Sequence, residues 1–184
     1  MADEKYLGFD PDGGGYRFEP LRKFRWELRI SGDQEPLTLV LLTCARPEMN
    51  FASTEVHHFN DRFYLAGKPE FSEIEFSMYD ARVDSNKAQN IIDGGKFASK
   101  ILEEWRDLVY DPRTSRMLPA EPVDGGGYKK NCELVQFDGV GNSVLRWQLL
   151  GCFPRVVNFN DLDYSSSDAC LVNCTLRIDK AYII

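Results

Sequence analysis

Few residues of this 184-residue chain could carry chemistry, and their spacing argues against a catalytic or metal centre. Both histidines, His57 and His58, are adjacent in the sequence. On an extended backbone their side chains point to opposite sides, so one metal ion or one nucleophile cannot easily use both. No third ligand follows at a spacing typical of a metal site. We therefore expect structural or interface roles for the two imidazoles.

The acid-rich segment from Asp161 to Asp168 superficially resembles a calcium loop. It lacks the glycine that an EF-hand has at its sixth position, and Val172 stands where the bidentate glutamate belongs. Turns in which Asp and Ser side chains satisfy backbone donors explain the same residues. The chain also has no G-x-S-x-G nucleophile turn. We expect no catalytic residue, no bound cofactor and no metal ion.

The five cysteines are odd in number and form no C-x-x-C pair. In a cytosolic chain this pattern favours buried thiols that pack as small hydrophobic side chains. A disulfide formed between subunits after release from the cell is the alternative. The cysteines are Cys44, Cys132, Cys152, Cys170 and Cys174.

Composition points to one folded domain without a nucleic-acid-binding surface. Hydrophobic residues make up 43% of the chain, and the net charge is −7, opposite in sign to that of a nucleic-acid binder. The N-terminus lacks the basic start and apolar stretch of a secretion signal, and no apolar run is long enough for a membrane helix. We expect a flexible arm at residues 1–20 and one domain at residues 21–184. Basic residues gather only at Arg22, Lys23, Arg25 and Arg29. Because Arg25 and Arg29 would share a strand face with Glu27, we expect ion pairs across strands, and nucleic-acid binding by this face is the weaker alternative.

Most of the chain has the two-residue hydrophobic period of sheet strands. Alternation is clear at 24–30, 74–78, 145–149 and 170–178, and the last of these places Cys170, Val172, Cys174, Leu176 and Ile178 on one face. Residues 37–45 are apolar on both faces, which predicts a strand covered on both sides, either by its own core or by a neighbouring subunit.

One helix is expected among the strands, because Phe97, Ile101, Trp105 and Leu108 fall at helical spacing. Asp111-Pro112 should end it, since a residue before proline is pushed out of helical geometry. Strands, one helix and strands again predict a mainly β protein, a β-sandwich or barrel with one flanking helix.

The segment 47–68 is too apolar for a solvated loop. Long loops without structure of their own are uncommon in compact domains unless they have a function. We expect burial against a neighbouring copy of the chain, because exposed apolar surface usually marks an interface. A hairpin folded back on its own domain is the alternative.

Several sequence words, in order, resemble one family. They are F-P-x-x-V-x-F at 153–159, D-L-D-Y-S-S-S-D at 161–168, E-V-H-H at 55–58, Y-x-A-G-K at 64–68 and the helix end that leads to Y-D-P at 110–112. Together they resemble contractile-phage (myovirus) tail tube proteins, which are related to inner tube proteins of contractile injection systems.

This resemblance implies a tail-tube-type fold and a structural role in the virion tail, after assembly in the host cytoplasm. Six copies would close a ring, and rings would stack into a tube inside a contractile sheath. A tape-measure protein would fill the channel, with a baseplate hub and a tail terminator at the ends. Double-stranded DNA would then pass without sequence-specific binding, and an acidic wall would help because DNA binds proteins largely through cations.

Three groups of residues are the expected assembly sites. The inter-ring loop would use Phe51, Val56, Phe59 and Phe63, and the acids Glu73 and Glu75, on the polar side of a strand, would face the lumen. The ring interface candidates are Leu39, Leu41, Cys170 and Val172.

Other functions remain open. An inner tube of a contractile injection system would share the fold and deliver protein in place of a genome. A tube-initiating protein at the baseplate is a related variant. A β-sandwich module that binds a carbohydrate or another ligand is a different class, and an enzyme fits least.

Overall fold

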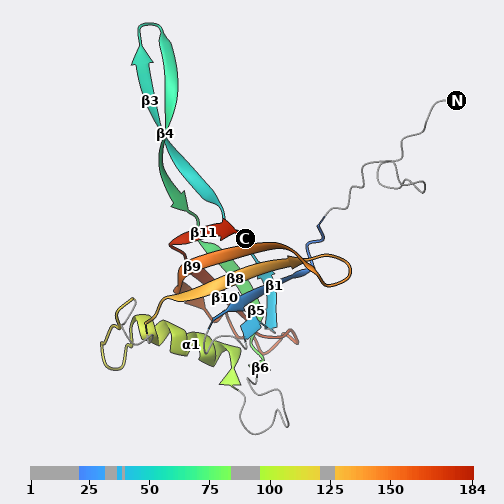
Figure 1. Cartoon of the computed structure of the whole chain (residues 1–184). Helices are drawn as coiled ribbons and strands as arrows, with labels where there is room; N and C mark the ends of the chain where they lie inside the picture. The colour runs from blue at the N-terminus through green and yellow to red at the C-terminus, as the bar shows by residue number, and fades with distance from the viewer. Residues whose placement is uncertain (1–20, 32–36, 39, 84–95, 121–126) are drawn as a thin grey trace, which may run out of the picture.

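The computed structural model describes residues 21–31, 37–38, 40–83, 96–120 and 127–184. These form a β-rich body with one helix at one end, and a long hairpin that stands away from the body (Figure 1). The predicted N-terminal arm and Leu39 lie outside the described residues. No helix among the described residues is both long and apolar enough to cross a membrane.

Eleven strands and one helix account for the described secondary structure. They are β1 (Trp26–Ile30), β2 (Leu41–Cys44), β3 (Met49–His58), β4 (Asp61–Phe71), β5 (Ile74–Tyr79), β6 (Arg82–Val83), β7 (Lys96–Phe97), α1 (Ala98–Val109), β8 (Lys130–Phe137), β9 (Ser143–Asn158), β10 (Leu171–Arg177) and β11 (Lys180–Ile183).

Seven strands form one antiparallel sheet in the order β1-β8-β9-β10-β5-β2, with β11 also paired to β9. Strand β9 belongs to both halves of this sheet. Its first part pairs with β8 and β11, and its last part, Phe153–Asn158, pairs with β10. We call β1, β8, β11 and the first part of β9 sheet A, and β2, β5, β10 and the last part of β9 sheet B.

The sheet bends at Gly151, where the backbone has a φ of +65°. Residues other than glycine rarely adopt this left-handed conformation. A side chain at this position would also collide with the Asp179 carboxylate. The Asp179 carboxylate forms an ion pair with Lys129 at 2.6 Å, which holds the carboxylate in place beside Gly151.

The inner faces of sheets A and B share one hydrophobic core with the helix. The alternation in β5 and β10 buries every second side chain, as predicted from the sequence. The buried members are Leu28, Ile30, Leu37, Ile74, Phe76, Met78, Val83, Ala98, Ile101, Leu102, Trp105, Cys132, Leu134, Leu149, Cys152, Val172, Cys174, Leu176 and Ile178.

Helix α1 closes one end of this core and differs from the prediction at its first turn. Ile101 and Trp105 are buried as expected, and the helix ends at Val109, just before Tyr110-Asp111-Pro112. Phe97, however, is half exposed, because it precedes the helix and pairs in β7. The Trp105 indole donates to the Tyr128 carbonyl at 2.8 Å, which fixes the helix to the body.

Mainly β structure with one flanking helix is confirmed, as a sandwich-like folded sheet and not as a closed barrel. One strand prediction was wrong. Residues 37–45 do not form one long strand, since only Leu41–Cys44 is extended and it forms the half-buried edge strand β2. Cover of this strand by a neighbouring subunit stays a prediction. Thr38 precedes it in a short helical turn, and its hydroxyl donates to the Leu28 carbonyl at 2.9 Å. The turn therefore shortens the strand.

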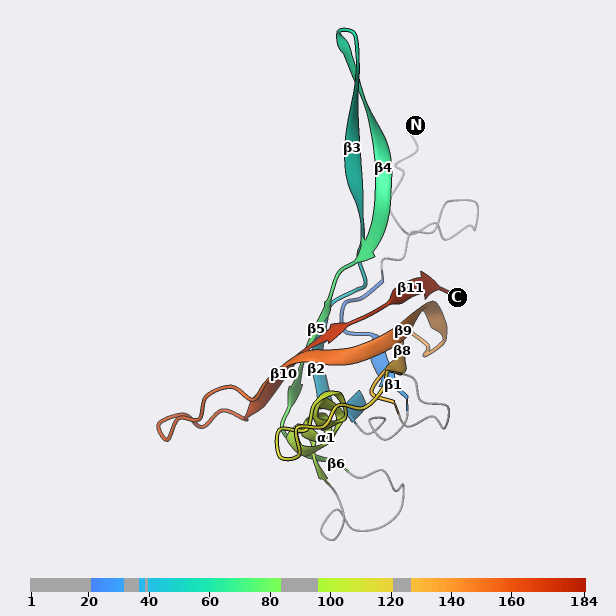
Figure 2. The same cartoon turned by 90° about the vertical axis from the view of Figure 1, so that its left-hand side faces the viewer.

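The segment 47–68 is a regular β-hairpin and not an irregular loop. Strands β3 and β4 pair from Met49↔Phe71 to His58↔Asp61. The alternative of a hairpin folded back on its own domain is also wrong, because the hairpin projects away from the body (Figures 1 and 2).

Candidate assembly surfaces

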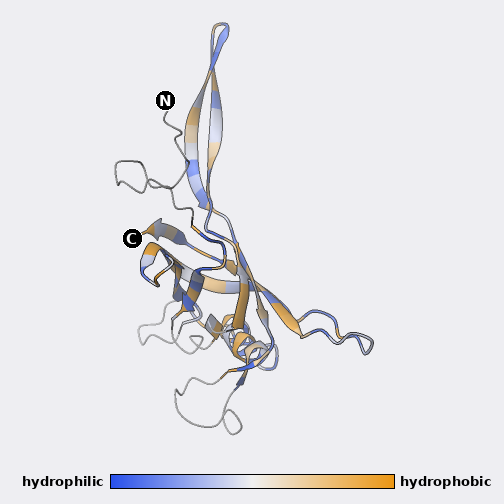
Figure 3. Ribbon diagram, turned by 90° about the vertical axis from the view of Figure 1, so that its right-hand side faces the viewer, coloured by the Kyte–Doolittle hydropathy of each residue, from blue (hydrophilic) through white to orange (hydrophobic). Residues whose placement is uncertain are grey.

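The hairpin formed by β3 and β4 is exposed along nearly its whole length. Phe59 at its tip is 94% exposed and has a φ of +52°. Hydrophilic and hydrophobic residues are mixed along the hairpin, although it lies away from the core (Figure 3). Apolar side chains so far from the core have no burial within their own chain, and this is typical of an interface.

The two faces of the hairpin differ in chemistry. Directly paired residues of antiparallel strands lie on the same face, so the strand register shows which side chains share a face. Near the tip, Val56 pairs with Phe63 on one face, and Glu55 pairs with Tyr64 on the other. Phe51 lies on the face opposite Val56, nearer the body. The four inter-ring candidates therefore come together on one hairpin, with Val56 and Phe63 in contact range and Phe51 and Phe59 apart from them.

The two histidines are near the tip and on opposite faces, as the sequence predicts. The His57 Nε2 atom lies 3.7 Å from a Glu55 carboxylate oxygen, and the His58 ring packs edge-on against Phe59. Within the described parts of the chain, no group of three or more His, Cys, Asp or Glu side chains could hold a metal ion.

A charge network joins the root of the hairpin to sheet B. Glu70 of β4 accepts a hydrogen bond from Arg177 of β10 at 3.0 Å. Glu73, in the connection to β5, forms an ion pair with Arg155 of β9 at 2.9 Å and lies 3.9 Å from Arg177. These contacts join the base of the hairpin to sheet B. They therefore help to fix the orientation of the hairpin relative to the body.

The outer face of sheet B is polar. One row across its four strands consists of Thr43, Ser77, Asn173 and Asn158. The Thr43 and Ser77 hydroxyls are hydrogen-bonded at 2.5 Å. A shallow cavity of about 410 Å³ lies over this row and includes Glu75. The face is thus rich in amides and hydroxyls.

Both lumen candidates lie on or beside this polar face. Glu75 is exposed and has no cationic partner among the residues that the structure describes. Glu73 is half buried and neutralised by Arg155 and, more distantly, Arg177. Because Glu73 is paired with these arginines, it would offer less negative charge to a channel than the sequence suggests.

Sheet B has two edges. Strand β2 is one edge, and Phe153–Asn158 of β9 is the other, since these residues pair only with β10 in the described part of the chain. Unpaired strand edges are templates for pairing with another chain. The two edges are on opposite sides of the same four-stranded sheet.

The ring interface candidates lie near these edges in different environments. Leu41 is half buried at the start of β2, and the Val172 side chain is buried in the core of its own subunit. Cys170 was predicted on the buried face of β10, and this was wrong. It is exposed, because the strand begins one residue later, at Leu171.

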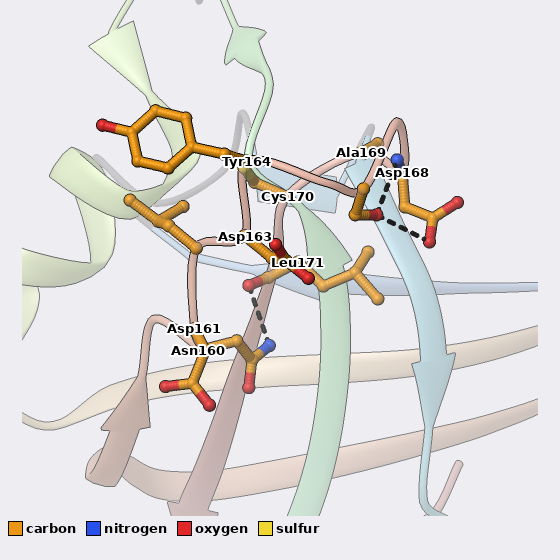
Figure 4. Close-up of a pocket in the computed structure, with 10 residues that line it drawn as sticks. Asn160, Asp161, Asp163, Tyr164, Asp168, Ala169, Cys170 and Leu171 are labelled. Carbon is orange, nitrogen blue, oxygen red and sulfur yellow. Dashed lines mark hydrogen bonds between the residues drawn. The ribbon is translucent and has the colours of Figure 1, made fainter.

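Residues 159–170, here called the acidic loop, join β9 to β10 and extend sideways from the body (Figure 2). The loop surrounds an open cavity of about 600 Å³ (Figure 4). The Asp163 carboxylate accepts hydrogen bonds from the Ser165 amide and hydroxyl at 2.8 Å, which lowers the pKa of Asp163. These are the turn contacts expected from the sequence. Leu162 and Tyr164 point outward, 83% and 112% exposed.

A second cavity, of about 500 Å³, lies at the open mouth of the sandwich between β1, β8 and β2. Gln136 of β8 lines it and is only 5% exposed. Its Oε1 atom has no hydrogen-bond partner among the described residues. Buried polar atoms are nearly always paired, so this unpaired acceptor calls for an explanation. The other lining residues are Lys23, Trp26, Leu42, Thr43, Cys44, Arg46 and Leu134.

Three of the five cysteines are packing residues, as predicted, whereas Cys44 is half buried and Cys170 is exposed. All five thiols are free, and Cys132, Cys152 and Cys174 are buried. Burial raises the pKa of Cys44 and of Cys174 to about 12. A thiol is a nucleophile only when it is deprotonated, so neither side chain is activated.

Solved structures with the same fold belong to contractile injection systems. A chain of the anti-feeding prophage cap (AFP tube terminating cap) is 16% identical and superimposes with a TM-score of 0.66, over 95% of this chain and 97% of that chain. A chain of the sheath/tube terminator of the extracellular contractile injection system PVC gives 13% identity, a TM-score of 0.63 and coverages of 91% and 98%. A chain of the PVC sheath-tube complex is 14% identical and superimposes with a TM-score of 0.60, over 90% of this chain and 91% of that chain.

At these identities the likeness establishes the fold, which is the tail-tube-type fold predicted from the sequence. No protein-family model and no curated protein sequence matches the chain.

Two features of these surfaces escaped the sequence. The network of Glu70, Glu73, Arg155 and Arg177 joins residues 82 to 107 positions apart, and no local sequence pattern predicts such a pairing. Gln136 follows the inward-facing residues Cys132 and Leu134 at the two-residue period, so its polar type at a core position was a visible signal.

Proposed function

We propose that this chain is a structural ring subunit of the tube of a contractile tail or injection system, acting by assembly and not by catalysis. The observation that carries the proposal is the hairpin of β3 and β4, which stands away from the body (Figure 1). Its side chains Phe59 and Phe63 are exposed, and Val56 is half buried opposite Phe63. The shared fold with tube-system proteins supports it.

Ring closure would use the two edges of sheet B. Pairing β2 of one copy with Phe153–Asn158 of the next satisfies backbone groups that are otherwise left to water. Repetition around an axis removes every edge and forms a barrel shared between subunits. We propose six copies per ring, with Leu39, Leu41 and Cys170 near the contact and Val172 supporting it from within.

Stacking would use the hairpin. Its tip reaches beyond the body, so it can pack against the adjacent ring and bury Val56, Phe59 and Phe63 there. Phe51, nearer the body, would pack at the ring boundary.

The polar face of sheet B would line the channel, with Glu75 and the paired Glu73 among its charges. A sheath would surround the tube, a tape-measure protein would fill it during assembly, and a baseplate hub and a terminator would bind its ends. The cargo we propose is double-stranded DNA, which passes without sequence-specific binding. Protein cargo is the alternative, because the similar structures belong to injection systems.

A tube-terminating cap is the second candidate. The likeness to the AFP cap complex over 95% of this chain favours it. A tube subunit should polymerise without limit when expressed alone, whereas a cap should stop at a ring of fixed thickness. Tube length in negative-stain images separates the two.

The test of the proposal is expression of the full chain alone, followed by negative-stain microscopy. Hollow rings or tubes are expected. Phe59→Asp should leave the melting temperature and the rings unchanged but stop stacking, because a buried unpaired carboxylate is costly. Val140→Asp, in an equally exposed turn of the body, is the matched control and should stack normally. A monomer at every protein and salt concentration would refute the proposal.

A further inference from the structure

We propose that neighbouring copies in the ring are joined by a plug and a socket. The plug is Tyr164 in the acidic loop of one copy, and the socket is the cavity beside Gln136 in the next. This inference rests on the proposed ring and names the side-chain contact that would close it.

The socket has the chemistry of a site for an aromatic group that carries a hydrogen-bond donor. Trp26, Leu42 and Leu134 supply apolar walls. Gln136, 95% buried, presents an Oε1 acceptor with no donor in the described part of the chain. A donor brought by a ligand would remove the cost of that unpaired atom.

Tyr164 fits this description and is the most exposed of the tyrosines that the structure describes. It is fully exposed, and a phenol combines an apolar ring with a hydroxyl donor. The loop that carries it is braced. Asn160 donates to the Leu171 carbonyl at 2.8 Å and accepts a hydrogen bond from Asn173 at 3.1 Å. A braced loop presents Tyr164 at little further cost in conformational entropy.

Charge complementarity favours the same pairing. Lys23 and Arg46 line the socket, and neither forms an ion pair within the described residues. Asp161, Asp163 and Asp168 flank Tyr164, and none of them has a cationic partner there. A second copy therefore brings an acidic loop to a basic rim, which steers association and fixes its direction.

The positions of plug and socket suit a head-to-tail ring. Thr43, which lines the socket, and Asn158, which precedes the acidic loop, end the same row of sheet B at opposite edges. The loop leads away from the body, so it cannot fill the socket of its own chain (Figure 2). Contacts between two different patches close into a ring when the rotation allows it.

The experiment measures the protein concentration at which rings of the full chain form, by light scattering and microscopy. Tyr164→Ala should raise it at least about tenfold, as truncation of a buried interface tyrosine does. Tyr164→Phe should raise it about fivefold, because Gln136 again lacks a donor. Val140→Ala, equally exposed but in the β8–β9 turn, is the matched control and should form rings like the natural chain.

A mixture of two variants tests the direction of the contact. Tyr164→Ala keeps its socket, and the double variant Lys23→Glu, Arg46→Glu keeps its plug. Each alone should stay monomeric at the natural chain's ring-forming concentration. Together they should form one-to-one complexes and no rings. The Tyr164 of the double variant can enter the intact socket of the Tyr164→Ala variant, but the reverse contact lacks both Tyr164 and the basic residues. Unchanged melting curves will show that both variants fold.

The outcomes separate this inference from the proposed function. A natural chain that forms no rings contradicts the proposed function itself. Normal rings from Tyr164→Ala overturn only the plug and socket. Loss of rings from Tyr16→Ala, but not from Tyr164→Ala, would assign the socket to the acidic and aromatic residues 1–20 and overturn the inference too.

Discussion

Gly151 shows how one residue determines the shape of the folded sheet. Its φ of +65° and the adjacent Asp179 carboxylate leave no room for a side chain. We expect Gly151→Ala to lower the free energy of unfolding by about 1–3 kcal/mol, because strain and collision add. Urea unfolding measures this loss. Gly141→Ala is the control, since Gly141 also has a positive φ but open space around it, and it should lose less. Equal losses of stability in the two variants would show that the collision with Asp179 adds no measurable cost.

Asp138 makes the turn between β8 and β9 sensitive to acid. Its carboxylate accepts hydrogen bonds from the Asn142 side chain at 2.9 Å and from the backbone amides of Val140, Gly141 and Asn142, and these lower the pKa of Asp138 to about 2. A lowered pKa adds stability above the unfolded value, near 4, and that stability disappears as the pH falls through about 2.

Asp138→Ala should therefore be less stable than the natural chain at pH 6 and nearly equal to it at pH 2. Urea unfolding across this pH range measures the difference. Asp161→Ala is the control, because it removes an exposed aspartate that accepts no hydrogen bond in the described part of the chain and should change the stability little at pH 6. A flat difference for Asp138→Ala would contradict the prediction.

At the scale of elements, the hairpin can work only if it points in a defined direction. Arg177 contacts Glu70 at the root of the hairpin and lies near Glu73, and Ser72 and Asn50 add a hydrogen bond of 3.0 Å there. The ion pairs are partly exposed, so they contribute little to overall stability. We expect these ion pairs to orient the hairpin relative to sheet B.

Arg177→Gln should change the free energy of unfolding by less than about 1 kcal/mol while reducing tube length at equal protein concentration. Microscopy gives the lengths, and rings should still form. Arg29→Gln is the matched control, because Arg29 joins Glu27 and Glu133 in a similar exposed network away from the hairpin. Equal tube lengths for the two variants would show that the root network does not orient the hairpin.

Periodicity predicted the body strands well, because β5 and β10 bury one face and a two-residue alternation reports that directly. It failed where one face is not buried by the chain itself. Both faces of β3 are exposed, so its apolar residues follow no core and read as an irregular loop. The length of edge strand β2 was not predictable for a related reason, because the chain itself leaves β2 only half buried and its apolar residues do not mark where the strand begins.

The surfaces were predictable only in part. The hairpin residues were found from their composition, because Phe51, Phe59 and Phe63 are unusual in a polar setting. The pairing of Glu73 with Arg155 was not predictable, since it depends on how β9 and the β4–β5 connection meet in space.

At the scale of the whole molecule, the paired charges on sheet B bear on how the proposed channel would interact with DNA. Proteins bind DNA mainly through cations that release counterions from phosphate. On the polar face, Arg155 is neutralised by Glu73 at 2.9 Å, and Arg177 by Glu70 at 3.0 Å. A channel with paired arginines offers phosphate few attachment points, even without a strongly acidic wall.

Glu73→Gln should break this arrangement by leaving Arg155 unpaired in every copy of the assembled tube. Such tubes should retain duplex DNA at low salt, with retention falling steeply as salt rises, whereas natural tubes should not. Glu75→Gln is the matched control. It removes the same charge but frees no arginine, because Glu75 has no cationic partner in the described part of the chain. Filter retention of labelled DNA measures the effect. Equal retention by the two variants would mean that net charge, and not pairing, sets the behaviour. No retention by either would place this face outside the channel.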